Sequence, residues 1–302
     1  MISLGTVKQM ELSQQIVRDV RIEIPLFHNS STMQNILTIP KENKIKAQVC
    51  RIMFNSASMA TCPYCSRKGV VRRDEKFQCQ RCQKAWSLTS LTWLKGMKLN
   101  WRTFWGLIWC YVNKVPIDQS CKLLSISRPT IYRWYDLFRR NLPDHENVNL
   151  DEIVVIDEAY FGRKDKKRAL LAAKQKGTSK VACRVITAGT VNRADLTPFL
   201  RQHVSPGSQL FSDGALIYRG LHKYWPVEHA YDVHSKGEFG KTSEIEGFFG
   251  SLRTFIRRMY HHVTMEKLPE IVSEYQSRLM YPEIFKEPAS FLAKTLTKFS
   301  FA

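Results

Sequence analysis

The sequence has few acidic residues and no long apolar run. Only 27 of its 302 residues are Asp or Glu, whereas 46 are Lys or Arg. The longest apolar run, residues 104–112, is too short to span a bilayer and contains Gly106 and Cys110. The first residues lack the basic start and apolar stretch of a secretory signal peptide. We therefore expect a protein of the cytoplasm or the nucleus.

The shortage of acids leaves a formal net charge of +19. Such a charge must be stabilised by a polyanion or tolerated as self-repulsion, and nucleic acid is the usual partner because binding it releases condensed counterions. The alternative is a basic surface that only faces solvent. Hydrophobic residues make up 44% of the chain, which is typical of a globular protein, and the length suits two or three domains.

Four of the eight cysteines form two C-x-x-C pairs, Cys62 with Cys65 and Cys79 with Cys82, separated by residues 66–78. Two such pairs present four thiolates to one tetrahedral ion, so the spacing predicts a zinc ribbon over residues 56–94. Four thiolates leave no open coordination position, and the Zn²⁺ should be structural. A pair of disulfides is the alternative, and a reducing compartment disfavours it. Basic residues on the ribbon, among them Arg72 and Arg73, are candidates for phosphate contacts.

Residues 95–145 are predicted to form a helix-turn-helix DNA-binding domain. Apolar residues recur at helical spacing from Trp101 to Val112, Pro116 opens a second helix, and Ser127 can cap a third. The last helix would expose Arg128, Thr130, Tyr132, Arg133, Arg139 and Arg140. Such a helix fits the major groove, where the first residues reach base edges. The same pattern also occurs in ordinary helical bundles.

After residue 149 the spacing of apolar residues changes from a helical pattern to short apolar runs. Residues 150–265 are therefore predicted to form an α/β domain. The expected strands are residues 153–156, 168–173, 181–188, 209–212 and 230–233, and the expected helices are residues 197–204 and a long helix from Ser243. Residues 266–302 are predicted as a C-terminal helical tail. For residues 1–55 the sequence predicts no chemistry.

Three acids of the α/β domain are candidate metal ligands. Asp157 and Asp213 follow predicted strands, at the strand ends where functional groups gather, and Glu246 lies on the long helix. One side of that helix carries Glu246, Gly250, Arg253 and Arg257. Along this side, a carboxylate is followed by a glycine that leaves space and then by two cations. The alternative is an exposed Glu/Arg face with an incidental glycine.

Other acids lie close to these three in the sequence. Glu158 should point to the opposite side of the strand from Asp157, and Glu244 lies on another side of the helix from Arg253. Asp232 has no evident partner. Carboxylate oxygens are the ligands that Mg²⁺ prefers, and two ions on such a set stabilise an in-line displacement at phosphorus.

Several motifs resemble the DDE transposases of zinc-ribbon insertion sequences and their eukaryotic relatives, the Merlin elements. They are IDEAYFG at 156–162, SDG at 212–214, HSKGEF at 234–239, IEGFFGSLR at 245–253 and YHHV at 260–263. The C-x-x-C ribbon and the helices that follow it resemble the N-terminal DNA-binding part of that family. The resemblance covers roughly residues 60–280.

The resemblance implies a ribonuclease H-like fold and cut-and-paste transposition at terminal inverted repeats. It implies two Mg²⁺ or Mn²⁺ ions on Asp157, Asp213 and Glu246, with Arg253 orienting a DNA phosphate. The partners would be double-stranded transposon ends and target DNA, held by a homodimer or higher oligomer in the bacterial cytoplasm and nucleoid or the eukaryotic nucleus. A domesticated, non-catalytic DNA-binding protein and a metal-dependent endonuclease are the alternatives.

Overall fold

The structure is a computed structural model of the chain, which divides into a unit Met1–Thr38 and a unit Ile39–Ala302. The described residues are 39–54, 62–67, 70–73, 76–90, 92–163, 167–187, 189–232 and 242–296, with only the backbone described for residues 71–73 and 232. All of them belong to the second unit. Among these residues, no helix has both the length and the apolar character needed to cross a membrane.

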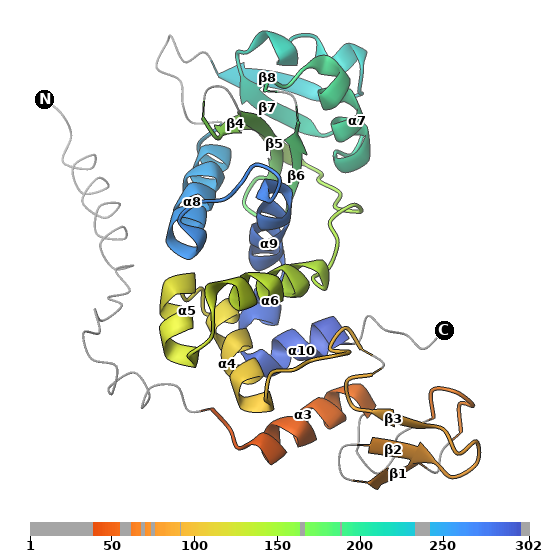
Figure 1. Cartoon of the computed structure of the whole chain (residues 1–302). Coiled ribbons are helices and arrows are strands. Elements are labelled where there is room, and N and C mark those ends of the chain that lie inside the picture. The colour runs from red at the N-terminus through yellow and green to blue at the C-terminus, as the bar shows by residue number, and fades with distance from the viewer. Residues whose placement is uncertain are drawn as a thin grey trace, which may run out of the picture. The chain divides into compact units, whose positions relative to one another are not determined.

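Three short antiparallel strands carry the cysteine pairs. They are β1 (Val70–Arg73), β2 (Lys76–Cys79) and β3 (Ala85–Ser87), in the order β1-β2-β3. Phe77 on β2 stacks on Trp86 of β3 with ring centroids 5.9 Å apart, and Phe54 at the end of α3 (Glu42–Phe54) packs on the same Phe77 ring. This small aromatic core joins the strands to the preceding helix (Figure 1).

Three helices follow where the sequence predicts them: α4 (Trp101–Val112), α5 (Ile117–Leu124) and α6 (Arg128–Arg140). Asn100 caps α4 by accepting a hydrogen bond of 2.8 Å from the backbone N–H of Thr103. Ser127 occupies the N-cap position of α6, but its hydroxyl contacts the Thr130 hydroxyl at 2.9 Å and makes no capping bond to the backbone. The short turn between α5 and α6 depends on Ser125, whose φ of 53° is left-handed.

A five-stranded mixed sheet forms the centre of the α/β domain. Its strands are β4 (Ile153–Phe161), β5 (Arg168–Gln175), β6 (Val181–Ile186), β7 (Gln209–Asp213) and β8 (Glu228–Asp232), in the order β6-β5-β4-β7-β8. Strands β4, β5 and β6 are antiparallel neighbours, whereas β4, β7 and β8 run parallel. Several predicted boundaries were wrong: β4 continues through Phe161, β6 ends at Ile186, α7 (Arg193–His203) begins before residue 197, and β8 begins at Glu228.

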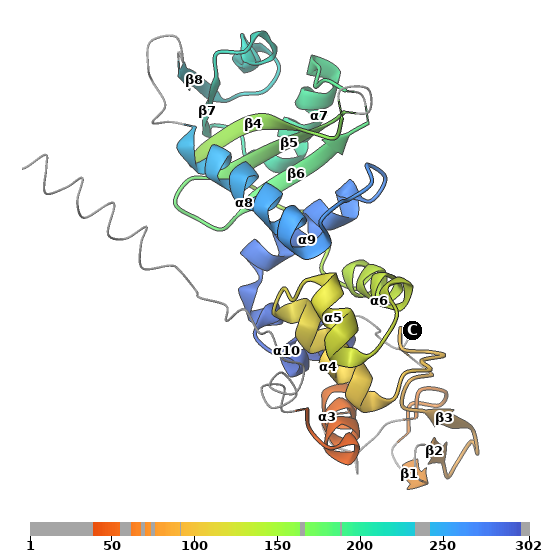
Figure 2. The same cartoon turned by 60° about the vertical axis from the view of Figure 1, so that its left-hand side comes forward.

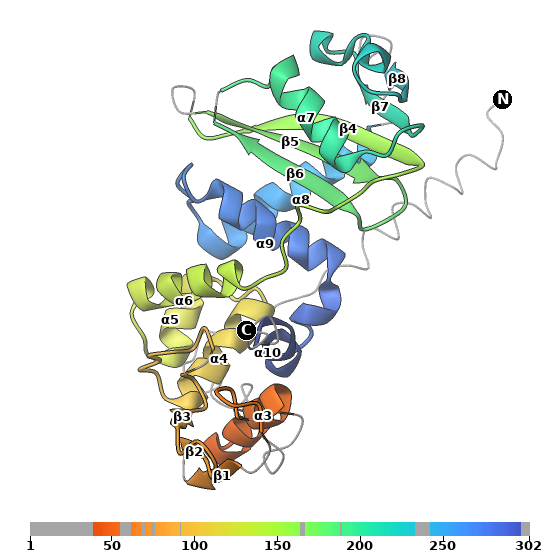
Figure 3. The same ribbon diagram turned by 90° about the vertical axis from the view of Figure 1, so that its right-hand side faces the viewer.

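Helices cover both faces of this sheet. α8 (Ser243–Tyr260) and α9 (Leu268–Met280) lie on one face and α7 on the other (Figures 2 and 3). Alternate residues of β4 are therefore buried in different clusters, Val155 with α8 and α9, and Val154 with α7. The predicted C-terminal tail contains α9 and α10 (Pro288–Leu296), and Gln276 on α9 donates a 2.7 Å hydrogen bond to the Val181 carbonyl of β6. The predicted domain boundaries themselves stay predictions.

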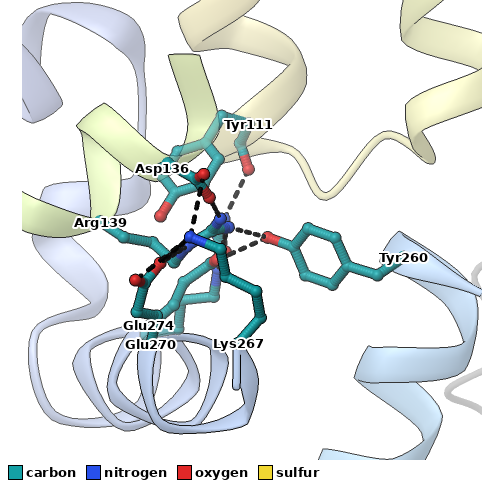
Figure 4. A network of polar contacts seen from close by, with 8 residues as sticks. Tyr111, Asp136, Arg139, Tyr260, Lys267, Glu270 and Glu274 are labelled. Carbon is teal, nitrogen blue, oxygen red and sulfur yellow. Dashed lines mark hydrogen bonds and ion pairs between the residues drawn. The ribbon is translucent and has the colours of Figure 1, made fainter. Parts of the chain in front are cut away.

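A buried polar network joins α6, α8 and α9 (Figure 4). At its centre is Glu274 on α9, whose side chain is fully buried. Its carboxylate accepts hydrogen bonds from Arg139 at 3.3 Å, from the Tyr260 hydroxyl at 2.5 Å and from Arg278 at 2.9 Å. The prediction that Arg139 is exposed for DNA was therefore wrong, because its guanidinium neutralises this buried carboxylate.

Arg278 extends the same network to the end of α4. Its guanidinium donates to the carbonyls of Tyr111 and Val112 at 2.6 and 3.1 Å. Cations near a helix C-terminus interact favourably with the helix dipole and satisfy the last carbonyls. The helices of the predicted DNA-binding domain are thus fastened to the helices that cover the sheet.

Candidate active site

Asp157 lies in the middle of β4, not after the strand end as the sequence predicted. The apolar run stops at Ile156, but the strand continues because residues 157–161 keep the full ladder with β5. In the parallel pairing of β4 with β7, Val155 is opposite Phe211. Asp157 and Asp213 are each two residues further along, so they lie side by side on the face that α8 covers.

Glu246 is in the first turn of α8, and the Thr242 hydroxyl donates a 3.2 Å hydrogen bond to its Oε1. Its neighbour Glu244 contacts other residues of the domain. It forms an ion pair with Lys174 on β5 and accepts a hydrogen bond of 3.1 Å from the backbone N–H of Gly177. These contacts lower the pKa of Glu244, with the hydrogen bond from Lys174 as the largest cause. Glu244 therefore fastens α8 to the β5–β6 turn.

The three candidate carboxylates influence one another. Burial, followed by the nearby charges of Glu158, Asp213 and Glu246, raises the pKa of Asp157 to about 7. Within the described part of the chain, none of Asp157, Asp213 and Glu246 takes part in an ion pair. Ionised carboxylates that lie close together repel one another, and this repulsion destabilises the fold. A bound cation would remove the repulsion.

Glu158 points to the opposite face of the sheet, as predicted. The Tyr218 hydroxyl, buried on that face, donates a hydrogen bond to the Glu158 carboxylate. Burial is the largest cause that raises the pKa of Glu158, and the Tyr218 bond opposes it. Glu158 adds negative charge near Asp157 and Asp213, but its oxygen is already engaged by a protein donor.

Hard divalent ions such as Mg²⁺ fit this set of donors, which is made of carboxylate oxygens alone. Among the described residues, only the cysteine group brings three or more ligand atoms within 4.8 Å of one another. The oxygens of Asp157, Asp213 and Glu246 are therefore spread more widely than the ligands of a single closed site. Two ions, each keeping waters and substrate phosphate as further ligands, suit a wider set.

A cationic row continues along α8 from Glu246. The Arg253 guanidinium lies over the Phe161 ring at 5.3 Å, at the far end of β4. Between Glu246 and Arg253, a Cβ added to Gly247 or Gly250 would meet no described atom within 4 Å. The chain's own packing therefore does not require these glycines, and they leave the surface of α8 open between the carboxylate and the cation. Arg257 is exposed one turn further on.

The four cysteines of the ribbon come together as predicted. Their sulfurs lie within 4.8 Å of one another, and none of the four cysteines is in a disulfide. Cys62 and Cys82 are 3.6 Å apart, and Cys65 and Cys79 are 3.7 Å apart. Such a group fits a tetrahedral metal ion and leaves no position for a substrate.

The two halves of this cluster have the same backbone turn. Ser66 donates to the carbonyl of Cys62 at 2.8 Å, and Gln83 donates to the carbonyl of Cys79 at 3.0 Å. Both Ser66 and Gln83 have a positive φ, 54° and 59°. Backbone N–H groups point toward the sulfurs in such turns, and that of Cys82 is the largest cause that lowers the pKa of Cys79 to about 6. Within the same cluster, burial and contacts with the other three thiols raise the pKa of Cys65 to about 11, so the thiols differ in how readily each becomes a thiolate.

The predicted DNA-reading residues of α6 have different environments. Arg128 is half exposed and forms an ion pair with Asp118 on α5, and Thr130 is held by Ser127. Tyr132 is partly buried against the core, whereas Arg133 is exposed. Of the ribbon candidates Arg72 and Arg73, the structure describes only the backbone, in β1.

A groove of about 380 Å³ between residues 93–99 and α6 was missed by the sequence analysis. Its cations are Lys95, Lys98, Arg133 and Arg140. The sequence signal for this groove is a pair of lysines three residues apart, together with the arginines of α6. Such a pattern is common in solvent-exposed segments. Only the packing of the segment against α6 brings these cations together.

Comparison with known proteins places residues 149–279 in a family. They match the model of the ISXO2-like transposase domain, which is the kind of family that the motifs predicted. No curated protein matches the chain. Solved structures resemble the chain at low sequence identity.

One is the simian T-cell lymphotropic virus intasome in complex with PP2A regulatory subunit B56 gamma. It is 9% identical with a TM-score of 0.33, over 57% of this chain and 67% of that chain. Another is the HTLV-2 integrase catalytic core domain in complex with magnesium. Its dimeric form is 10% identical with a TM-score of 0.31, over 44% of this chain and 88% of that chain. The trimeric form of the same domain is also 10% identical, with a TM-score of 0.29, over 44% and 86%.

Proposed function

We propose that this protein is a cut-and-paste DNA transposase, which binds terminal inverted repeats, cleaves the DNA there and joins the freed end to target DNA. The observation that carries the proposal is the acidic centre of the transposase domain. Asp157 and Asp213 lie on the face of the sheet that α8 covers, Glu246 lies in the first turn of α8, and no described cation pairs with any of the three. An acidic centre on a strongly basic protein is the charge arrangement that a phosphate substrate requires once cations are bound.

Asp157, Asp213 and Glu246 would hold two divalent ions, Mg²⁺ or Mn²⁺. Bound ions of this kind activate water at neutral pH and stabilise the oxygens that attack and leave phosphorus. Burial and the charges of Glu158, Asp213 and Glu246 raise the pKa of Asp157, so a bound cation would favour its ionised carboxylate. Arg253 would orient the phosphate of the DNA strand, and the open surface at Gly250 would admit the backbone of that strand.

DNA recognition is assigned to the ribbon and to α4–α6. A structural Zn²⁺ on Cys62, Cys65, Cys79 and Cys82 would hold the ribbon, because a cluster of four thiolates has no free position for catalysis. Arg133, Thr130 and Tyr132 would contact DNA from α6, with Arg128 leaving Asp118 to do so, and Arg72, Arg73 and Arg257 would add phosphate contacts.

The sheet order β6-β5-β4-β7-β8, with acids on β4 and β7 and on α8, supports a ribonuclease H-like classification of the domain. Two transposon ends must be held together during the reaction, so the active form would be a homodimer or a higher oligomer. The protein would act where its DNA is, in the cytoplasm and nucleoid of a bacterium or in a eukaryotic nucleus.

The matched pair Glu246→Gln and Glu244→Gln tests the proposal. Supercoiled plasmid is incubated with the protein and Mg²⁺ or Mn²⁺, together with a labelled duplex that the protein has selected from a random-sequence pool. Glu246→Gln should lower nicking by at least about 100-fold, since losing a ligand removes several kcal/mol of transition-state stabilisation. Glu244→Gln, two residues away, should leave nicking within about threefold of wild type.

The products separate the possible activities. Labelled DNA joined to the plasmid is expected, and nicking with no joined product would instead identify an endonuclease. Binding of the selected duplex without cleavage under either metal would identify a DNA-binding protein that lacks catalysis. Equal nicking by Glu246→Gln and wild type would show that the acidic centre is wrongly assigned.

A further inference from the structure

A second groove lies where strands β4, β5 and β6 end, beside the loop between α8 and α9. Its volume is about 1090 Å³. Its lining comes from the end of β4 and the start of β5, from the segment after β6 and from the α8–α9 loop: Tyr160, Gly162, Arg163, Lys167, Arg168, Thr187, Gly189, Thr190 and residues 262–266. Figures 2 and 3 show the ends of these strands and the α8–α9 loop on the same side of the molecule. Because strands end there, side chains from both faces of the sheet reach this groove.

The groove is cationic. Among the described residues, Arg163, Lys167 and Arg168 line it together with one acid, Glu266. Neither arginine forms an ion pair with a carboxylate among the residues whose positions are described, and the Lys167 ammonium instead lies over the ring of Tyr160 at 5.3 Å. Cations lining a groove in this way attract an anionic ligand.

An exposed aromatic ring lies among these cations. The Tyr160 side chain is 39% exposed, although β4 is otherwise largely buried. Tyr160 follows Asp157 by three residues on the same strand, about 10 Å along it, and its side chain points to the face of the sheet that Glu158 shares. Burial and then the charges of Glu158 and Asp157 raise the pKa of Tyr160, as expected from its closeness to the acidic centre.

We propose that this groove is a second DNA subsite, which binds the phosphates of one strand on Arg163, Lys167 and Arg168 and stacks one base on Tyr160. Aromatic rings bordered by cations are the platforms on which single strands stack their bases. The proposal deepens the proposed function and rests on it for the identity of the substrate.

The residues near the ring favour a strand of nucleic acid over an acidic peptide. Gly162, with a φ of 96°, and Gly189 both line the groove and present no side chain to a closely approaching backbone. A stacked base also uses the flat face of Tyr160, which a carboxylate cannot use. An acidic peptide, which would need only the cations, is therefore an outcome that the experiment must separate.

The test uses the full-length protein with its zinc in place, in buffer without Mg²⁺ or Mn²⁺, and a series of short single strands, each with one 2-aminopurine at a different position. We expect strong quenching of 2-aminopurine at one position with wild type and with Tyr160→Phe. Tyr160→Ala should abolish that quenching and weaken binding about 10-fold. Arg163→Ala should lower the slope of log affinity against log salt by about 0.7, whereas Arg201→Ala, an exposed arginine on α7, should not change it.

Several results would overturn the inference. Equal quenching by wild type and Tyr160→Ala would show that no base stacks on this ring. Equal effects of Arg163→Ala and Arg201→Ala would reduce the groove to general surface charge. Displacement of the strand by poly-glutamate at a lower concentration than by an unlabelled single strand would point to a peptide site. Because binding is measured without Mg²⁺ or Mn²⁺, loss of DNA cleavage would overturn only the proposed reaction, whereas absence of stacking would overturn only the subsite.

Discussion

The buried carboxylate of Glu274 offers the most direct test of how the chain is held together. Its side chain is fully buried, and it accepts hydrogen bonds from Arg139, Arg278 and Tyr260. Glu274→Gln keeps the size of the side chain but removes the charge. Two guanidinium groups, each at most 7% exposed, would then lose their shared counter-ion.

Breaking a buried ion pair by removing one partner costs about 3–5 kcal/mol, because the remaining charge stays desolvated. For a unit of this size, each kcal/mol lowers the melting temperature by about 2–4 °C. We therefore expect Glu274→Gln to lower the unfolding free energy by about 3–5 kcal/mol and the melting temperature by roughly 6–20 °C. Urea denaturation, followed by both far-UV circular dichroism and tryptophan fluorescence, measures the loss.

Glu270→Gln is the matched control, one turn earlier on α9. Its side chain is 33% exposed, and its contacts are to Arg139 at 3.7 Å and to Lys267 at 3.1 Å. Solvent screens these pairs, so the expected loss is about 0–1 kcal/mol. Equal stability of Glu274→Gln and Glu270→Gln, or a loss below about 1 kcal/mol for Glu274→Gln, would refute the claim that a charged network fastens α6 to α9.

Three further outcomes follow from the same contacts. In metal-free protein the pKa of Asp157 is raised from 3.8 to about 7, so the native state keeps a proton that the unfolded chain releases. Stability should fall as pH rises from about 4 to 7, and Asp157→Asn should remove that fall and be more stable than wild type at pH 8 by about 2 kcal/mol in urea titrations. Cys79→Ser should lose the bound zinc, measured by atomic absorption, and expose residues 62–90 to protease, whereas Cys121→Ser should retain both metal and protection. Arg133→Ala should lower the salt slope of duplex binding by about 0.9 in fluorescence anisotropy, and an unchanged slope would remove Arg133 from the DNA interface.

The local spacing of residues was enough to predict the ribbon cysteines and the three helices after them. A C-x-x-C turn places two sulfurs close together through covalent geometry and a few backbone hydrogen bonds. The helices of residues 101–140 follow from apolar periodicity, a capping asparagine and a short turn. These features involve interactions within a few residues, and a sequence displays such interactions directly.

The extent of β4 could not be predicted in the same way. Asp157 and Glu158 interrupt the apolar run, so the pattern ends the strand where the structure continues it. Pairing with β5 supplies the hydrogen bonds that hold residues 157–161 extended, and β5 is a separate segment of the chain. The position of Asp157 in mid-strand is thus a property of the sheet.

Arg139 shows most clearly that the sequence alone does not predict which charged residues are buried. On the sequence it is one more arginine on the outer side of a basic helix, and it is expected to face DNA. The structure buries it against Glu274, which lies 135 residues away along the chain.

By itself, the sequence determined the kinds of group that the protein uses: four thiols, a few carboxylates and many cations. The spacings of these groups resemble those of a known transposase family. Only the tertiary structure decided which of these groups are engaged with one another. Glu244 and Arg139 are neutralised by distant partners, whereas Asp157, Asp213 and Glu246 have no described cation partner. The physical reason is that a charge is neutralised by whatever lies within a few ångströms in space, and that distance is set by the fold.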